Sequence, residues 1–129
     1  MKKKYLIVVA DYYEDISEGL LNSALQTIPK LNFIKIIKVP GVFEIPVTIA
    51  KNIKKYDGFL ALGCVIKGET PHFDFISQAS TNAVVNLSVI NKKPIGNGII
   101  TCLNMRQAKA RKNKGAEAAK AVISILSQK

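Results

Sequence analysis

Residues 67–72 (KGETPH) contain the side chains best suited to binding or catalysis. They follow directly after the apolar run Gly58–Ile66 (GFLALGCVI). Gly68 would allow backbone amides to approach an anion, and a helix beginning after this segment would direct its positive end at a phosphate. Thr70 adds a hydroxyl donor, and His72, the only histidine of the chain, carries an imidazole suited to proton transfer near neutral pH. The segment therefore indicates an anion-binding loop with a general acid or base beside it. The alternative is a lone histidine that serves only as a helix cap or surface residue.

A second polar segment, residues 40–46 (PGVFEIP), follows another apolar run. Glu44 would lie among backbone amides there and could accept hydrogen bonds from ligand hydroxyls, or it could simply complement the positive end of a helix. Tyr12 and Tyr13 follow the first apolar run of the chain and could stack on a planar ring, although paired tyrosines in a loop also serve as packing residues.

Basic residues collect near the end of the chain, where Arg106 and Arg111 are the only arginines among the 19 basic residues. A run of this kind is usually a solvated helix face, and a nucleic-acid patch is one alternative. A third interpretation uses Arg111 alone, because its planar guanidinium matches a pair of phosphate oxygens. The lysines of the run are Lys109, Lys112 and Lys114.

Other common chemistries lack support in the sequence. Neither G-x-x-x-x-G-K-[ST] nor G-x-G-x-x-G is present, and the single histidine and two separated cysteines offer no close pair of metal ligands. Cys64 and His72 could form a nucleophile and its base, but Cys64 lies inside an apolar run, where a structural thiol is expected. We therefore expect no metal site, and we expect Cys64 and Cys102 to be free, buried thiols.

Apolar patterns predict the elements that must position these residues. Short apolar runs without helical period predict strands at Lys4–Ala10, Phe33–Val39, Gly58–Ile66 and residues 95–103, the last despite its two glycines. Apolar stripes with helical spacing predict the helices between them.

The first helix carries a stripe from Ile16 to Ile28, with Asp15 as its cap. The second covers residues 43–55, provided that Pro46 lies in its first turn. The third carries a stripe from Phe75 to Ile90, and residues 104–112 and 116–128 form one interrupted helix or two successive ones.

Strands that alternate with helices predict a parallel sheet with helices on both faces, because parallel strands need crossover connections. Ligands of such sheets bind outside the carboxyl ends of the strands. The loops at residues 11–15, 40–44, 67–72 and from 103 onward fall there, so the polar segments should meet at one edge of the sheet.

Length and composition fit one domain spanning residues 1–129. Of the 129 residues, 48% are hydrophobic, which suffices for a core without a metal or disulfide. No segment approaches the ~18 consecutive apolar residues that span a bilayer, so we expect a cytoplasmic protein without a membrane partner. The net charge of +10 comes mainly from dispersed lysines, which favours a solvated surface over nucleic-acid binding.

Three motifs together resemble one enzyme family. They are residues 39–46 (VPGVFEIP), 61–75 (ALGCVIKGETPHFDF) and 113–119 (NKGAEAA), and their order is that of the 6,7-dimethyl-8-ribityllumazine synthases of riboflavin biosynthesis. The resemblance covers nearly the whole chain. It implies a three-layer α/β/α sandwich with a four-stranded parallel sheet, doubly wound and flavodoxin-like, and it favours His72 as the catalytic residue.

The resemblance implies that 5-amino-6-(D-ribitylamino)uracil condenses with 3,4-dihydroxy-2-butanone 4-phosphate to the lumazine, releasing phosphate and water. The amine attacks the ketone to form an imine, phosphate is eliminated, and the ribityl-bearing nitrogen closes the ring. A group such as His72 would transfer the protons. Such a reaction needs no redox cofactor or metal.

The same resemblance assigns residues to each of the two small-molecule substrates. Those assigned to the ribitylaminouracil are Tyr12, Val42, Phe43, Glu44, Cys64, Val65, Ile66 and Asn97. Those assigned to the butanone phosphate are Glu69, Thr70, Arg111 and Lys114.

Two departures from the family pattern leave alternatives open. Asn97 replaces an aromatic ring that the adjacent subunit commonly supplies, and Arg111 lies only three positions before Lys114. Arg106 is the rival phosphate ligand, because its separation from Lys114 along the sequence is closer to the usual spacing.

The runner-up function is a catalytically weakened protein that binds a flavin or lumazine. The resemblance also implies a homo-oligomer, a pentamer with active sites between subunits and in some cases an icosahedral shell of pentamers.

Overall fold

A parallel sheet forms the centre of the protein. The computed structural model describes residues 2–68 and 71–128. Within them the strands β1 (Lys4–Ala10), β2 (Phe33–Val39), β3 (Gly58–Ile66) and β4 (Ile95–Cys102) form a four-stranded sheet in the order β2-β1-β3-β4, and every neighbouring pair is parallel. The prediction of a four-stranded parallel sheet is confirmed.

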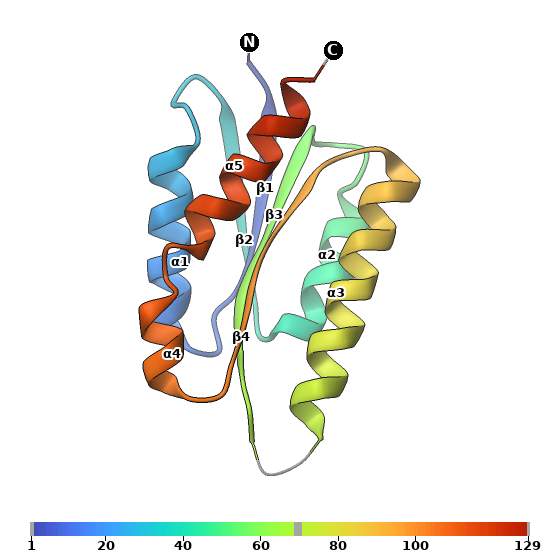
Figure 1. Ribbon diagram of the computed structural model, residues 1–129. Coiled ribbons are helices and arrows are strands. Elements are labelled where there is room, and N and C mark those ends of the chain that lie inside the picture. The colour runs from blue at the N-terminus through green and yellow to red at the C-terminus, as the bar shows by residue number, and fades with distance from the viewer. Residues whose placement is uncertain (1, 69–70, 129) are drawn as a thin grey trace.

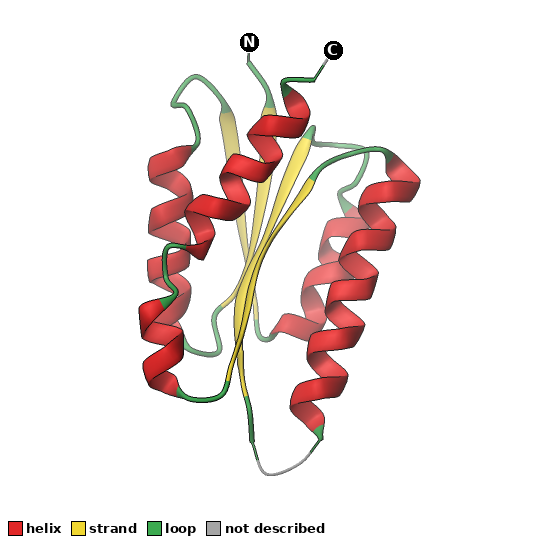
Figure 2. Cartoon of the chain, in the orientation of Figure 1, coloured by secondary structure: helices red, strands yellow, loops and turns green. Residues whose placement is uncertain are grey.

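Helices cover both faces of the sheet (Figure 1). On one face lie α1 (Glu14–Thr27), α4 (Met105–Ala110) and α5 (Lys114–Leu126); on the other lie α2 (Ile45–Lys51) and α3 (His72–Asn91). Figure 2 shows the yellow sheet between these two red layers. The arrangement is the three-layer, flavodoxin-like α/β/α sandwich.

Two apolar cores fill the spaces between the layers, and the alternating side chains of β1 contribute to both. Ile7 and Val9 belong to the core that includes residues of α1 and α5, whereas Leu6 and Val8 belong to the core that includes residues of α2. Because β1 is covered on both faces, its sequence is a continuous apolar run.

Some helix ends differ from the sequence prediction. Asp15 does not cap α1, because the helix already begins at Glu14 and Tyr13 is its N-cap residue. The helix expected over residues 43–55 is shorter: residues Val42–Glu44 form a 3-10 turn, and α2 covers Ile45–Lys51. Pro46 lies in the first turn of α2, as predicted, where its missing N–H leaves no hydrogen bond unmade.

The end of the chain forms two successive helices. Strand β4 stops at Cys102, one residue earlier than predicted, and Asn104 caps α4 by accepting a hydrogen bond from the Gln107 N–H at 2.9 Å. The last helix begins at Lys114, two residues earlier than predicted, and ends at Leu126.

Gly96 and Gly98 belong to β4 because neighbouring elements pack directly against them. A Cβ at Gly96 would clash with the Ala118 carbonyl of α5, and a Cβ at Gly98 would clash with the Leu62 side chain. The glycines weaken the local preference for a strand but allow α5 to approach the sheet. No described helix is long and apolar enough to cross a membrane.

Candidate active site

A pocket of about 630 Å³ opens where β1, β2 and β3 end. The chain passes from β1 to β2 on one side, while β3 pairs with β1 on the other, so the strand order reverses here. Open parallel sheets bind ligands outside such a reversal. The described residues that line the pocket are Tyr12, Tyr13, Gly41, Val42, Phe43, Glu44, Cys64, Val65, Ile66, His72 and Ile76.

This pocket, called the ring pocket below, gathers His72 and all residues predicted for the ribitylaminouracil except Asn97. Gly41 and Ile76 were not predicted. Ile76 lies one helical turn after His72, so the i, i+4 spacing of the sequence could have indicated it. Gly41 had no signal of its own beyond its place next to Pro40.

His72 is the first residue of α3, and its side chain is exposed at the pocket wall. The Phe75 N–H donates to the Pro71 carbonyl at 3.2 Å and closes the first turn of this helix. The imidazole is therefore placed at the positive end of a 20-residue helix, where negative charge that develops on a ligand is stabilised. The predicted loop residues Glu69 and Thr70 lie outside the described residues.

Glu44 lies at the N-terminal end of α2, half-buried, and among the described residues its carboxylate has no partner in a capping hydrogen bond. Its Oε1 lies beside Gly41, where a Cβ would come within 3.0 Å of it. The missing side chain at Gly41 leaves room for the carboxylate along the pocket wall. The carboxylate can reach a ligand in the pocket from this position, and its place at the N-terminal end of α2 also fits charge complementarity with that helix.

Tyr12 and Tyr13 form the rim of the ring pocket. Their rings meet edge to face, with centroids 4.9 Å apart and planes at 84°. Tyr13 packs against the core, whereas Tyr12 is 76% exposed. One tyrosine thus serves as a packing residue, and the other presents a ring face on which a planar ligand can stack.

Cys64 contributes a neutral thiol to the pocket. Burial, and secondarily the neighbouring Cys102, raise the pKa of Cys64 to about 12. Within the described chain both cysteines are free and buried, as predicted. A thiol that holds its proton is a poor nucleophile, so Cys64 shapes the pocket rather than attacking a substrate.

A second pocket, of about 540 Å³, lies beside the edge strand β4 and is called the anion pocket below. Its described lining includes Asn97, Thr101, Arg111, Asn113, Lys114 and Glu117, and it shares no described residue with the ring pocket. Asn97 therefore lies with Arg111 and Lys114, and not with the other residues predicted for the ribitylaminouracil.

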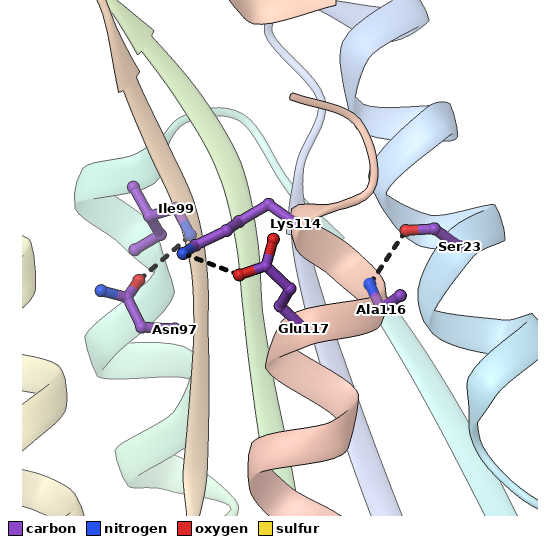
Figure 3. Close-up of polar contacts among 6 residues, drawn as sticks. All are labelled: Ser23, Asn97, Ile99, Lys114, Ala116 and Glu117. Carbon is purple, nitrogen blue, oxygen red and sulfur yellow. Dashed lines mark hydrogen bonds and ion pairs between the residues drawn. The ribbon is translucent and has the colours of Figure 1, made fainter. Parts of the chain in front are cut away.

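The two cations of the anion pocket lie at either end of the short turn between α4 and α5. The Lys114 N–H donates to the Arg111 carbonyl at 3.0 Å, so a single tight turn joins them. Arg111 Nη1 donates to the Thr101 carbonyl at 3.3 Å, and Lys114 Nζ lies 3.4 Å from Glu117 Oε1 (Figure 3). The short connection that departs from the family pattern thus still brings both cations to one pocket.

Asn97 has a defined orientation at this edge of the sheet. Its Oδ1 accepts a hydrogen bond from the Ile99 N–H at 3.1 Å (Figure 3). The amide nitrogen is therefore directed away from the strand backbone.

Arg106, the rival phosphate ligand, is an exposed residue of α4 and is absent from the described lining of the anion pocket. Of the two arginines, Arg111 lines the same pocket as Lys114. Over residues 2–68 and 71–128, no cluster of three or more His, Cys, Asp or Glu side chains could hold a metal ion.

The fold defines a flavodoxin-like α/β protein with pockets at the strand ends and at the sheet edge. Residues 2–129 match the model of the 6,7-dimethyl-8-ribityllumazine synthase family. The chain belongs to this family.

Relatives that bear the name 6,7-dimethyl-8-ribityllumazine synthase align over almost their whole length. The protein of Bartonella henselae is 44% identical over 138 residues, which cover 99% of this chain and 89% of the relative. That of Agrobacterium fabrum is 41% identical over 143 residues, which cover 100% of this chain and 97% of the relative.

Proposed function

We propose that the chain is a transferase of riboflavin biosynthesis that condenses 5-amino-6-(D-ribitylamino)uracil with 3,4-dihydroxy-2-butanone 4-phosphate. The products are 6,7-dimethyl-8-ribityllumazine, phosphate and water. The observation that carries the proposal is the joint presence of Tyr12, Glu44 and His72 in one pocket of a chain that belongs to this family. A ring-closing condensation on a ribityl-bearing pyrimidine is served by three kinds of group: an aromatic ring that stacks on the pyrimidine, an acceptor of hydrogen bonds from the ribityl hydroxyls, and an acid–base group.

The ring pocket would hold the ribitylaminouracil. Tyr12 stacks on the pyrimidine, Glu44 accepts hydrogen bonds from ribityl hydroxyls, and the strand end at residues 64–66 contacts the pyrimidine edge through its backbone. Val42 and Phe43 pack along the ribityl chain. The lining residues of this pocket come from four separate segments of the chain, which supports a ligand with several distinct parts.

The anion pocket would hold the phosphate of the second substrate. Arg111 and Lys114 supply two positive charges from either end of the short turn between α4 and α5, and the guanidinium fork suits a pair of phosphate oxygens. Glu69 and Thr70 are proposed to complete the phosphate side from the loop before His72, although these two lie outside the described residues. Asn97, with its Oδ1 engaged, would offer its amide nitrogen to the ribitylaminouracil bound in the ring pocket of an adjacent subunit.

His72 would transfer the protons of the reaction. Imine formation requires a proton to reach the departing carbonyl oxygen. Phosphate elimination requires a proton to leave carbon. Ring closure again requires a proton to reach a departing carbonyl oxygen. A single group beside both substrates can serve these steps in turn. Holding two reactants together supplies much of the remaining acceleration. The reaction as proposed needs no cofactor.

We propose that the active site forms between neighbouring subunits of a pentamer. The separation of the ring pocket from the anion pocket supports this, because the second lies at an open edge of the sheet where a neighbouring copy can approach. A mass measurement in solution distinguishes a single pentamer from an icosahedral shell of such pentamers.

We also propose a single domain over residues 1–129 in the cytoplasm, where buried free thiols stay reduced.

Turnover with both substrates tests the function. We expect the purified protein to form lumazine, followed by its absorbance, and to release one phosphate per lumazine at a rate well above the protein-free condensation. Omission of either substrate is the control. Ribitylaminouracil binding without accelerated lumazine formation would contradict the proposal and identify a weakened ligand-binding protein instead.

A further inference from the structure

Ser23, on α1, is hydrogen-bonded to the segment that carries Arg111 and Lys114. Its Oγ donates toward the carbonyls of Leu20 and Lys112, each at 3.0 Å, and accepts from the Ala116 N–H at 3.0 Å. Figure 3 shows the Ser23–Ala116 bond. One hydroxyl group thus joins α1 to both sides of the turn that separates α4 from α5.

Close packing reinforces this junction. A Cβ at Gly115 would clash with the Leu20 carbonyl and come within 2.5 Å of Ser23 Oγ. A Cβ at Gly19 would come within 2.5 Å of the Lys112 side chain, so the stem of this lysine lies directly on α1. Residues 111–116, called the cationic turn below, therefore rest on α1 with little free space.

Backbone hydrogen bonds leave the cationic turn little freedom to move independently of α4 and α5. The Arg111 N–H donates to the Ala108 carbonyl at 3.1 Å, and the Lys114 N–H donates to the Arg111 carbonyl, so consecutive hydrogen bonds link α4 directly to α5. A shift of this turn would move both cations together relative to β4. Its placement on α1 consequently determines where the anion pocket presents its charges.

We propose that Ser23 is a positioning residue for phosphate binding: its hydroxyl holds the cationic turn so that Arg111 and Lys114 face the anion pocket. This inference rests on the proposed function, because it assumes that the anion pocket binds the butanone phosphate. Ser23 itself lines neither described pocket. It acts through the turn, which contacts α1 through the hydrogen bonds of Ser23 and the packing of Gly115.

The test compares Ser23→Ala with Thr27→Val. Thr27 lies one helical turn further along α1, and its Oγ1 donates to the Ser23 carbonyl at 2.9 Å within the same helix, so its loss controls for a general effect on α1. We expect Ser23→Ala to raise the KM for butanone phosphate by ~5-fold, the equivalent of one ordinary hydrogen bond. The KM for ribitylaminouracil and the kcat should stay near those of the parent.

A second variant and a second measurement make the outcome decisive. Ser23→Cys keeps a weak donor of similar shape, so its KM should fall between those of the parent and Ser23→Ala. Hydrogen exchange of the amides of residues 112–117 should accelerate in Ser23→Ala and not in Thr27→Val. Equal KM values and equal exchange in Ser23→Ala and Thr27→Val would overturn the inference. A parent protein without turnover would instead contradict the proposed function, and the exchange comparison would still test the link between Ser23 and the turn.

Discussion

His72 is the first residue of α3 and lines the ring pocket, and we propose that its imidazole transfers the protons of the reaction. We expect His72→Asn to slow lumazine formation by ~10²–10⁴-fold, the usual contribution of a general acid or base, while the fold and the assembly persist. Asparagine keeps a hydrogen-bonding side chain of similar size, so it separates loss of proton transfer from loss of shape. Steady-state rates above the protein-free background measure the effect.

An unchanged rate of His72→Asn at saturating substrates would remove this residue from the mechanism. Binding of ribitylaminouracil to the variant, measured separately by fluorescence, should match the parent. A loss of binding as large as the loss of rate would indicate that His72 holds the substrate instead of transferring protons.

Loss of the Glu44 carboxylate should weaken the binding of one substrate much more than that of the other. Loss of a charged acceptor costs about 1.5–3 kcal/mol when its partner is buried, so we expect Glu44→Ala to weaken ribitylaminouracil binding by ~10–100-fold. The affinity for butanone phosphate should change little, because Glu44 lines only the ring pocket among the two described pockets. Titration with each substrate in turn measures the difference, and equal losses for both would indicate a helix-end or folding effect.

The Cys64 thiol should make the folded state sensitive to alkaline pH. Its pKa is raised from 9.0 to about 12 by burial and by Cys102, whereas in the unfolded chain the thiol ionises near its ordinary value. The stability that results is fully present below pH ~9 and is lost as the pH rises toward 12. We expect denaturant unfolding of Cys64→Ala to show a shallower loss of stability over this range than the parent. Parallel pH profiles would show that the thiol ionises equally in both states.

Single residues differed in how far the sequence could predict them. The sequence predicted that His72, Glu44 and Tyr12 would meet in one place, because each follows an apolar run and parallel strands bring such segments to one edge; all three line the ring pocket. Ser23 had no comparable signal: it is one serine in an amphipathic helix, and its partner Ala116 is 93 residues away. Only the packing of α5 on α1 brings the two together.

At the scale of elements, β4 depends on two glycines that weaken its own strand preference. We expect Gly96→Ala to destabilise the fold by ~1–3 kcal/mol, because the new methyl group would force α5 away from the sheet. Gly68→Ala is the matched control, since a Cβ at Gly68 would meet no described atom within 4 Å. Urea unfolding measures both variants, and equal stability would show that α5 can move without loss.

The elements were predicted most accurately where a short apolar run without helical period marks a strand, as in the buried β1 and β3 and in the largely exposed edge strand β2. The observed bounds of β1, β2 and β3 are those expected from their apolar runs. The shortness of α2 could not be predicted, because residues 52–55 are compatible with a helix and leave it only to reach β3. The glycines of β4 could be explained only once α5 was seen to pack against them.

In the molecule as a whole, the ring pocket and the anion pocket of one chain share no described lining residue. The ring pocket contains His72, and the anion pocket contains Arg111 and Lys114 at the sheet edge. A condensation requires both substrates in contact. We therefore predict that the ring pocket of one copy meets the anion pocket of the next. In a closed ring of identical subunits, every interface then holds one complete site.

Mixed assemblies of two defective variants test whether each active site is shared between two copies of the chain. Copies carrying His72→Asn and copies carrying Arg111→Ala, coexpressed with different tags and purified through both, should form hybrids that contain interfaces with an intact His72 facing an intact Arg111. We predict that lumazine formation at low butanone phosphate recovers to about a quarter of the parent rate for random equal mixing. Hybrids no more active than the average of the two uniform variant assemblies would show that each copy holds a complete site and would contradict the account.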